Sequence, residues 1–117
     1  MLKLYGYKKC GSCRKAEKFF QQVNVDYTFI DITESPPTPE ELADIAKLAS
    51  LPLKKLFNTS GVQYRELNIK AQLPVISDLE ILALLARNGR LIKRPLVTDK
   101  KQATVGFKEA SFVEVWG

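Results

Sequence analysis

The fold of this chain is decided by residues 2–32, which read LKLYGYKKCGSCRKAEKFFQQVNVDYTFIDI. The first apolar residues favour a short strand that stops at Gly6. From Ser12 to about Val23 the apolar side chains recur at helix spacing. VDYTFIDI then alternates between apolar and polar residues, which is typical of a second strand. A strand, a helix and a strand within about 30 residues predict a parallel βαβ unit with a right-handed crossover.

Helices dominate the middle of the chain. In SPPTPEEL, Thr38 suits the N-cap of a helix, and Glu41 lies at the position that completes a capping box. Shorter helical segments are expected at about 52–57 and 64–69, and a longer helix is expected over 78–87.

The last third of the chain returns to strands. LIKRPLVTD and KQATVGF predict two short strands joined by a turn, and a final helix follows from Glu109 to about Val115. This order predicts an α/β fold in one domain, residues 1–117. Its core would comprise about residues 1–33 and 90–117, with a helical insertion at about 38–88.

Composition and charge restrict the class of protein. With 117 residues, 45% hydrophobic and 26% charged, the chain resembles an ordinary soluble domain. It has no apolar run near the roughly 20 residues that span a bilayer and no signal-peptide pattern, so we expect a cytoplasmic monomer without membrane contact. Lys and Arg outnumber Asp and Glu by 18 to 13, which permits anion binding. No aromatic and basic motif predicts direct nucleic-acid binding.

The two cysteines, Cys10 and Cys13, are the most informative residues, because the chain has no other cysteine and no histidine. A structural zinc site normally needs four Cys or His ligands, so we expect no metal. A structural disulfide across three residues would close a very small loop and contribute little stability. A reactive thiol is therefore the favoured interpretation, and the absence of histidine excludes Cys–His proteolytic chemistry.

The position of Cys10 favours it as the nucleophile. It lies between a predicted strand and a predicted helix, where unpaired backbone N–H groups and the helix dipole stabilise a thiolate. Lys8, Lys9 and Arg14 add positive charge nearby, so we expect a lowered pKa. Cys13, one turn into the helix, could resolve a mixed disulfide on Cys10. The alternative for Cys13 is a small core residue.

Several motifs in order along the chain resemble those of the ArsC/Spx family. They are LYGYKKCGSCRKA, DITESPPTPEEL, LKKLFNTSGVQYRELN, LIKRPLV and VGFKE. The family includes glutaredoxin-linked arsenate reductases and the redox-sensing Spx regulators. The resemblance covers nearly the whole chain, and it implies a thioredoxin-like fold with a helical insertion.

The resemblance also implies the residues of an anion site. The family pattern C-x-x-x-R matches Cys10 and Arg14, where the arginine binds the oxyanion and holds the thiolate. The R-P pair matches Arg94 and Pro95, with a cis peptide between them, which would bring Arg94 beside Cys10.

The chain departs from the arsenate reductases at two further arginine positions. It has Asn58 and Phe107 there. Arg65, which follows Asn58 in YREL, is the remaining candidate for anion binding from that part of the chain.

Two functions follow from the resemblance. The first is a thiol reductase related to arsenate reductases, without a bound cofactor. Its electrons would come from glutathione with glutaredoxin, or from thioredoxin, and its substrate would be small and oxidised or anionic. The second is an Spx-like regulator, in which a Cys10–Cys13 disulfide changes binding to the C-terminal domain of the RNA polymerase α subunit. The CxSCRKA signature is shared with Spx. A plain redox domain without a dedicated partner is a third interpretation.

Overall fold

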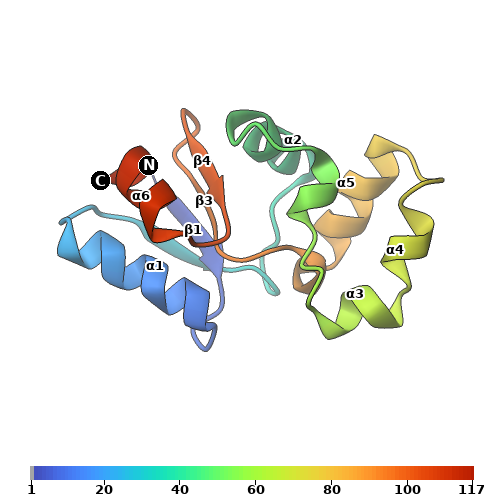
Figure 1. The fold of residues 1–117 in the computed structure, drawn as a ribbon, viewed down its shortest axis with the longest axis horizontal. Helices are drawn as coiled ribbons and strands as arrows, with labels where there is room; N and C mark the ends of the chain where they lie inside the picture. Colours follow the sequence, from blue (N-terminus) through green and yellow to red (C-terminus); the bar gives the residue numbers. More distant parts are fainter. Residues whose placement is uncertain (1) are drawn as a thin grey trace.

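A computed structural model describes residues 2–117, and its centre is a four-stranded sheet of order β2-β1-β3-β4 (Figure 1). Strand β1 is parallel to β2 and antiparallel to β3, and β3 is antiparallel to β4. The strands are β1 (Lys3–Gly6), β2 (Thr28–Asp31), β3 (Leu96–Thr98) and β4 (Ala103–Val105). The predicted βαβ unit and the later pair of strands are both confirmed.

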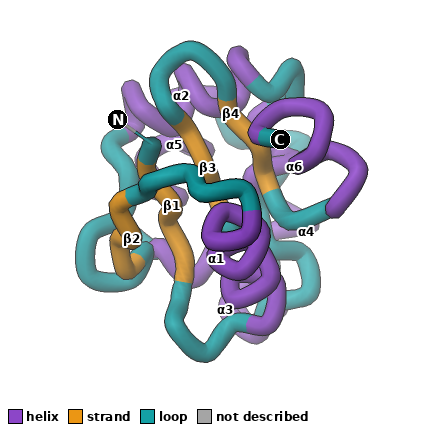
Figure 2. Tube along the Cα trace, turned by 90° about the vertical axis from the view of Figure 1, so that its left-hand side faces the viewer, coloured by secondary structure: helices purple, strands orange, loops and turns teal. Residues whose placement is uncertain are grey.

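Two helices, α1 (Gly11–Gln22) and α6 (Glu109–Trp116), share one apolar cluster with one face of the sheet (Figure 2). Leu4 and Val97 enter this cluster from the strands, and both are fully buried. The rings of Phe20 on α1 and Phe112 on α6 lie 5.6 Å apart between centroids. This cluster therefore joins the N-terminal and C-terminal parts of the core.

The other face of the sheet continues into a helical insertion between β2 and β3 (Figure 1). Tyr5 and Leu96 from the sheet belong to the same buried cluster as the apolar residues of the insertion. No described helix is long and apolar enough to cross a membrane. The insertion consists of α2 (Pro39–Leu48), η1 (Leu53–Leu56), α3 (Val62–Glu66), α4 (Ile69–Gln72), α5 (Asp78–Arg87) and the short η2 (Gly89–Leu91).

The start of α2 departs from the predicted capping box. Thr38 caps the helix as expected, because its hydroxyl accepts from the Glu41 main-chain N–H at 3.1 Å. The Glu41 carboxylate instead accepts from the Tyr5 hydroxyl and from Lys3 Nζ. The second half of the predicted box is therefore wrong. The sequence showed a local partner for Glu41, whereas the fold offers it two donors on β1 and so ties α2 to the sheet.

The insertion returns to the sheet through a very close backbone approach at Gly89. A Cβ atom at this position would lie 1.9 Å from the Ile32 carbonyl oxygen, so only glycine fits. Ile32 follows the end of β2, beside the end of β1. This contact brings the segment that carries Arg90 and Arg94 next to the loop that carries Cys10.

Candidate functional site

Cys10 lies at the junction of β1 and α1, as the sequence predicted. It is the N-cap residue of α1, with extended backbone angles, and its carbonyl accepts from the Arg14 N–H at 3.0 Å. Its own N–H donates to the Tyr7 carbonyl at 3.3 Å, which closes the loop after β1. The half-buried thiol thus lies at the positive end of a 12-residue helix.

Cys13 lies in the first turn of α1 and is fully buried. Its sulfur packs against the backbone of Gly6 at the end of β1. A Cβ at Gly6 would lie 2.5 Å from Cys13 Sγ, so the glycine makes room for the second thiol. Both cysteines are free.

The environments of the two thiols push their pKa values apart. Burial by itself raises the pKa of Cys10, but hydrogen bonds from the Cys13 side chain and main chain and from the Arg94 guanidinium stabilise its thiolate. The net result is a lowered pKa for Cys10. Burial, and then the hydrogen bond and charge of Cys10, raise the pKa of Cys13 to about 12. The lowered pKa of Cys10 and the raised pKa of Cys13 therefore each have a physical cause in this structure.

Arg94 lies close enough to Cys10 to lower its pKa, and the Arg94–Pro95 peptide is cis, as the resemblance implied. The guanidinium carbon lies 4.1 Å from the centre of the Tyr7 ring. Arg94 Nε and the Tyr7 hydroxyl are both buried without a hydrogen-bond partner among the described residues. Burial raises the pKa of Tyr7 although Arg94 and Arg90 lower it, so Tyr7 keeps its proton at neutral pH. Two hydrogen-bond donors without a described partner therefore belong to residues that interact with Cys10.

A cavity of about 990 Å³ opens beside Cys10, between the sheet and the insertion. Such a volume is typical of a small-molecule site. In the described part of the chain, no group of three or more Cys, Asp or Glu side chains could hold a metal ion. The cavity is lined by Tyr7, Lys8, Lys9, Cys10, Gly11, Asp31, Thr33, Asn58, Gly61, Val62, Gln63, Glu66, Arg90 and Arg94.

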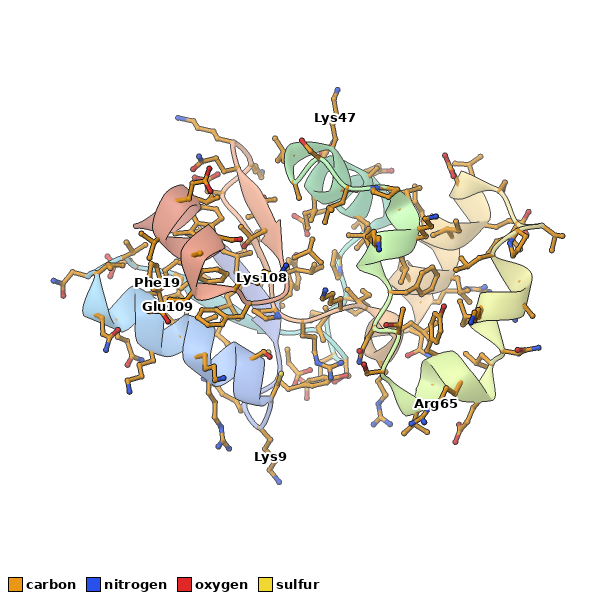
Figure 3. The ribbon with its side chains drawn as sticks, viewed as in Figure 1. Lys9, Phe19, Lys47, Arg65, Lys108 and Glu109 are labelled. Carbon is orange, nitrogen blue, oxygen red and sulfur yellow. The ribbon has the colours of Figure 1, made fainter. Side chains whose placement is uncertain are left out.

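The other two predicted arginines lie outside this lining. Arg14 Nε donates to the Lys8 carbonyl at 3.0 Å, so Arg14 holds the loop after β1. Arg65 is exposed on α3, and Figure 3 shows it together with Lys9 at the outer edge of the molecule. Of the two departures from the reductases, Asn58 lines the cavity. Phe107 instead packs on Phe112, with ring centroids 4.7 Å apart.

Sequence reasoning missed several lining residues, among them Tyr7, Asp31 and Arg90. Asp31 carried a usable signal, because it ends β2 directly beside Gly6 at the end of β1, and the ends of neighbouring parallel strands meet at one edge. Its carboxylate accepts from the N–H and hydroxyl of Thr33, which lower its pKa. Arg90 carried no such signal, since the close approach at Gly89 brings it to the site.

With this geometry established, a sequence profile described as the ArsC family matches residues 5–115. The chain belongs to the ArsC family. It is 51% identical over 115 residues to the uncharacterized protein YusI of Bacillus subtilis strain 168, covering 98% of each chain. It is 31% identical to the global transcriptional regulator Spx of Streptococcus pyogenes serotype M1, covering 93% of this chain and 80% of that one.

Solved structures agree with this assignment. An ArsC-family-related protein from Bacteroides fragilis superposes with a TM-score of 0.91 at 42% identity, over 97% of this chain and 95% of that one. The arsenate reductase from Vibrio cholerae shares the fold, with a TM-score of 0.86 at 24% identity over 97% and 96% of the two chains. The predicted thioredoxin-like fold with a helical insertion is thereby confirmed. The family relates the chain both to arsenate reductases and to Spx regulators.

Proposed function

We propose that this protein is a thiol-dependent reductase in which Cys10 is the nucleophile and Cys13 the resolving thiol. The observation that carries the proposal is the environment of the Cys10 sulfur. It lies in a cavity, has a lowered pKa, and adjoins two buried donors without partners, Arg94 Nε and the Tyr7 hydroxyl. Such donors favour negative charge on a bound substrate or on a departing group.

The size and charge of the cavity favour a substrate larger than one oxyanion. Its volume of about 990 Å³ is roughly thirty times the ~30 Å³ that one water occupies in the liquid. Arg90 and Arg94 supply positive charge, while Asp31 and Glu66 supply negative charge. Both signs of charge suit a disulfide of a small thiol that carries carboxylate and ammonium groups, of which glutathione is the example.

The first step would be attack by the Cys10 thiolate on one sulfur of the substrate disulfide. A bond forms between Cys10 Sγ and that sulfur, the substrate S–S bond breaks, and the other half leaves as a thiolate. Arg94 and Tyr7 line the same cavity as Cys10, and their side chains would stabilise this departing charge.

The second step would be attack by Cys13 on the Cys10 sulfur. Once Cys10 is in a mixed disulfide, its negative charge and its hydrogen bond no longer raise the Cys13 pKa, and burial is the main remaining cause. The Cys13 thiol loses its proton, a Cys10–Cys13 disulfide forms, and the second half of the substrate leaves and takes up that proton as a thiol. Two electrons from an external thiol, thioredoxin or glutathione with glutaredoxin, would then restore both thiols.

An Spx-like regulatory role is the second candidate, and the adjacency of the two thiols favours it. Cys10 and Cys13 lie close enough to affect each other's pKa, so oxidation could join them without a bound substrate. In that case the disulfide would change binding to a partner, for which we propose the C-terminal domain of the RNA polymerase α subunit.

The test is a coupled assay that follows NADPH consumption with a glutathionylated peptide, and in parallel with arsenate, through thioredoxin or through glutaredoxin. Turnover should vanish in Cys10→Ser. Cys13→Ser should accumulate substrate disulfide-linked to Cys10, detectable by intact mass. If Cys13→Ser forms no adduct and the wild type shows no turnover with either substrate, the reductase proposal fails. Oxidation-dependent binding to the polymerase α domain would then support the regulator.

A further inference from the structure

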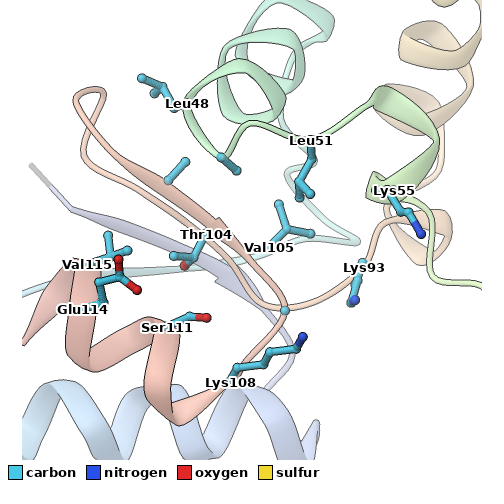
Figure 4. Close-up of a pocket in the computed structure, with 13 residues that line it drawn as sticks. Leu48, Leu51, Lys55, Lys93, Thr104, Val105, Lys108, Ser111, Glu114 and Val115 are labelled. Atoms are coloured by element: carbon cyan, nitrogen blue, oxygen red, sulfur yellow. The ribbon is translucent and has the colours of Figure 1, made fainter.

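A second cavity shares no lining residue with the one beside Cys10. It has a volume of about 390 Å³ and lies between the end of α2, the edge strand β4 and α6 (Figure 4). Lys93 lines this cavity, whereas the next residue, Arg94, lines the one beside Cys10. Consecutive side chains of an extended segment point to opposite sides, so the same short segment serves two separate cavities.

Three lysines gather at one end of this cavity: Lys55 from η1, Lys93 from the segment before β3, and Lys108 at the start of α6 (Figure 4). Within residues 2–117, ion pairs are formed by Lys3 and Lys8 but not by these three. These three exposed lysines, with Glu114 as the acidic residue in the lining, give the hollow a net positive charge. A bound anion would relieve their mutual repulsion.

Gly106 forms part of the same end of the cavity and adopts φ +79°, a conformation that favours glycine. A Cβ atom here would lie 2.9 Å from Lys93 Cε and 3.6 Å from Lys93 Nζ. The lysine side chain therefore lies across the glycine, and the absence of a side chain at Gly106 keeps space open beside the ammonium group.

The rest of the cavity differs in character. Leu48, Leu51 and Val105 supply apolar wall, and Glu114 lies at the end opposite the lysines (Figure 4). The cavity is therefore cationic at one end, apolar in the middle and anionic at the other end. A ligand with one anionic group and an apolar body matches this order, and a second anionic group near Glu114 would be repelled.

We propose that this cavity binds a phosphate monoester with a compact apolar body. Lysine ammonium groups bind phosphate as compact point charges, and three of them balance the charge of a dianion better than that of a singly charged carboxylate. The phosphate lies among the three ammonium groups, and the ester group packs on the leucines and Val105. This site is independent of the chemistry proposed for Cys10.

The test is a titration of ¹⁵N-labelled full-length protein with phenyl phosphate, followed by amide chemical shifts at constant ionic strength. At pH about 7.5 the monoester is mainly a dianion, because its second pKa is about 6. Inorganic phosphate and phenol serve as the two partial ligands. The variants are Lys93→Gln and Lys108→Gln. Lys101→Gln is the matched control, because this exposed lysine on the β3–β4 turn loses the same charge but lines neither cavity.

Saturable shifts are expected at the Gly106 and Ser111 amides, with a Kd of about 1 mM or tighter. Affinity should fall about fivefold or more in Lys93→Gln and Lys108→Gln, and should stay unchanged in Lys101→Gln. Inorganic phosphate should bind more weakly than phenyl phosphate. Equal weakening in all three variants, shifts confined to the Cys10 and Gly11 amides, or equal shifts with phenol would each overturn the proposal.

Discussion

Replacing Arg94 by glutamine isolates the contribution of its charge to the reactivity of Cys10. The guanidinium donates a hydrogen bond to the Cys10 sulfur and attracts its negative charge. A hydrogen bond to a charged group contributes roughly 1.5–3 kcal/mol, and we take the lower end because the cavity is open to water. Since 1.36 kcal/mol corresponds to a factor of ten, the thiolate fraction at pH values below the Cys10 pKa should fall about tenfold in Arg94→Gln.

The assay is the rate of alkylation of Cys10 as a function of pH, in a Cys13→Ser background so that a single thiol reacts. The Arg94→Gln profile should move to higher pH, with slower alkylation at pH values below the Cys10 pKa and a plateau at high pH at least as high as that of the parent, because a thiolate with a higher pKa is the stronger nucleophile. Arg87→Gln, at the exposed end of α5, removes the same charge away from the cavity and should leave the profile unchanged. Superimposable profiles for Arg94→Gln and the parent would refute the argument. A lower plateau with loss of the thermal transition would show that the variant had simply unfolded.

Three further predictions concern the packing and the polar groups around the site. In urea unfolding, Gly89→Ala should destabilise the protein by about 3 kcal/mol or more, because its methyl group would clash with a main-chain carbonyl. Gly11→Ala is the control: open space surrounds Gly11, so the free energy of unfolding should stay within about 1 kcal/mol of wild type. Tyr7→Phe should leave the free energy of unfolding unchanged or higher, because it removes a buried hydroxyl without a described partner. The same variant should have a lower kcat in the coupled assay. An equal kcat would show that the hydroxyl does not contact the substrate. The raised pKa values of Cys13 and Tyr5 contribute stability that is complete below their unfolded values of about 8.5 and 10, so Tm should fall as pH rises above about 8.5. Cys13→Ala should make that fall shallower, and an identical slope in the variant would contradict the assignment.

The local elements were predictable because their signals are short-range. The cap at Thr38 and the helix over 78–87 depend on residues within one turn of each other, and both match the structure. The position of Cys10 at the start of a helix was predictable in the same way, because a strand that stops at Gly6 and a helical apolar pattern from Ser12 lie on either side of it. Glu41 shows the limit of such reasoning, because its partners on β1 are more than 30 residues away.

Which residues line the cavity beside Cys10 was only partly predictable. Arg94 was identified through a family motif, whereas Arg65 looked equally suitable in the sequence and lies outside the cavity lining. The difference arises from the direction of α3, which carries Gln63 and Glu66 toward Cys10 and leaves Arg65 exposed. A helix of five residues has fewer than two turns, which is too short for the spacing of its apolar residues to show which face is buried.

The sequence by itself determined the class of fold and the position of Cys10 at the start of a helix, because both depend on neighbours along the chain: apolar periodicity and a glycine at the end of a strand. Only the tertiary structure decided which cations meet that thiol. Gly89 against Ile32 and the contacts of the insertion with the sheet bring Arg90 beside Cys10, and they gather three lysines from separate segments around the second cavity. These proximities are set by packing between distant segments, for which a single sequence carries no local signal.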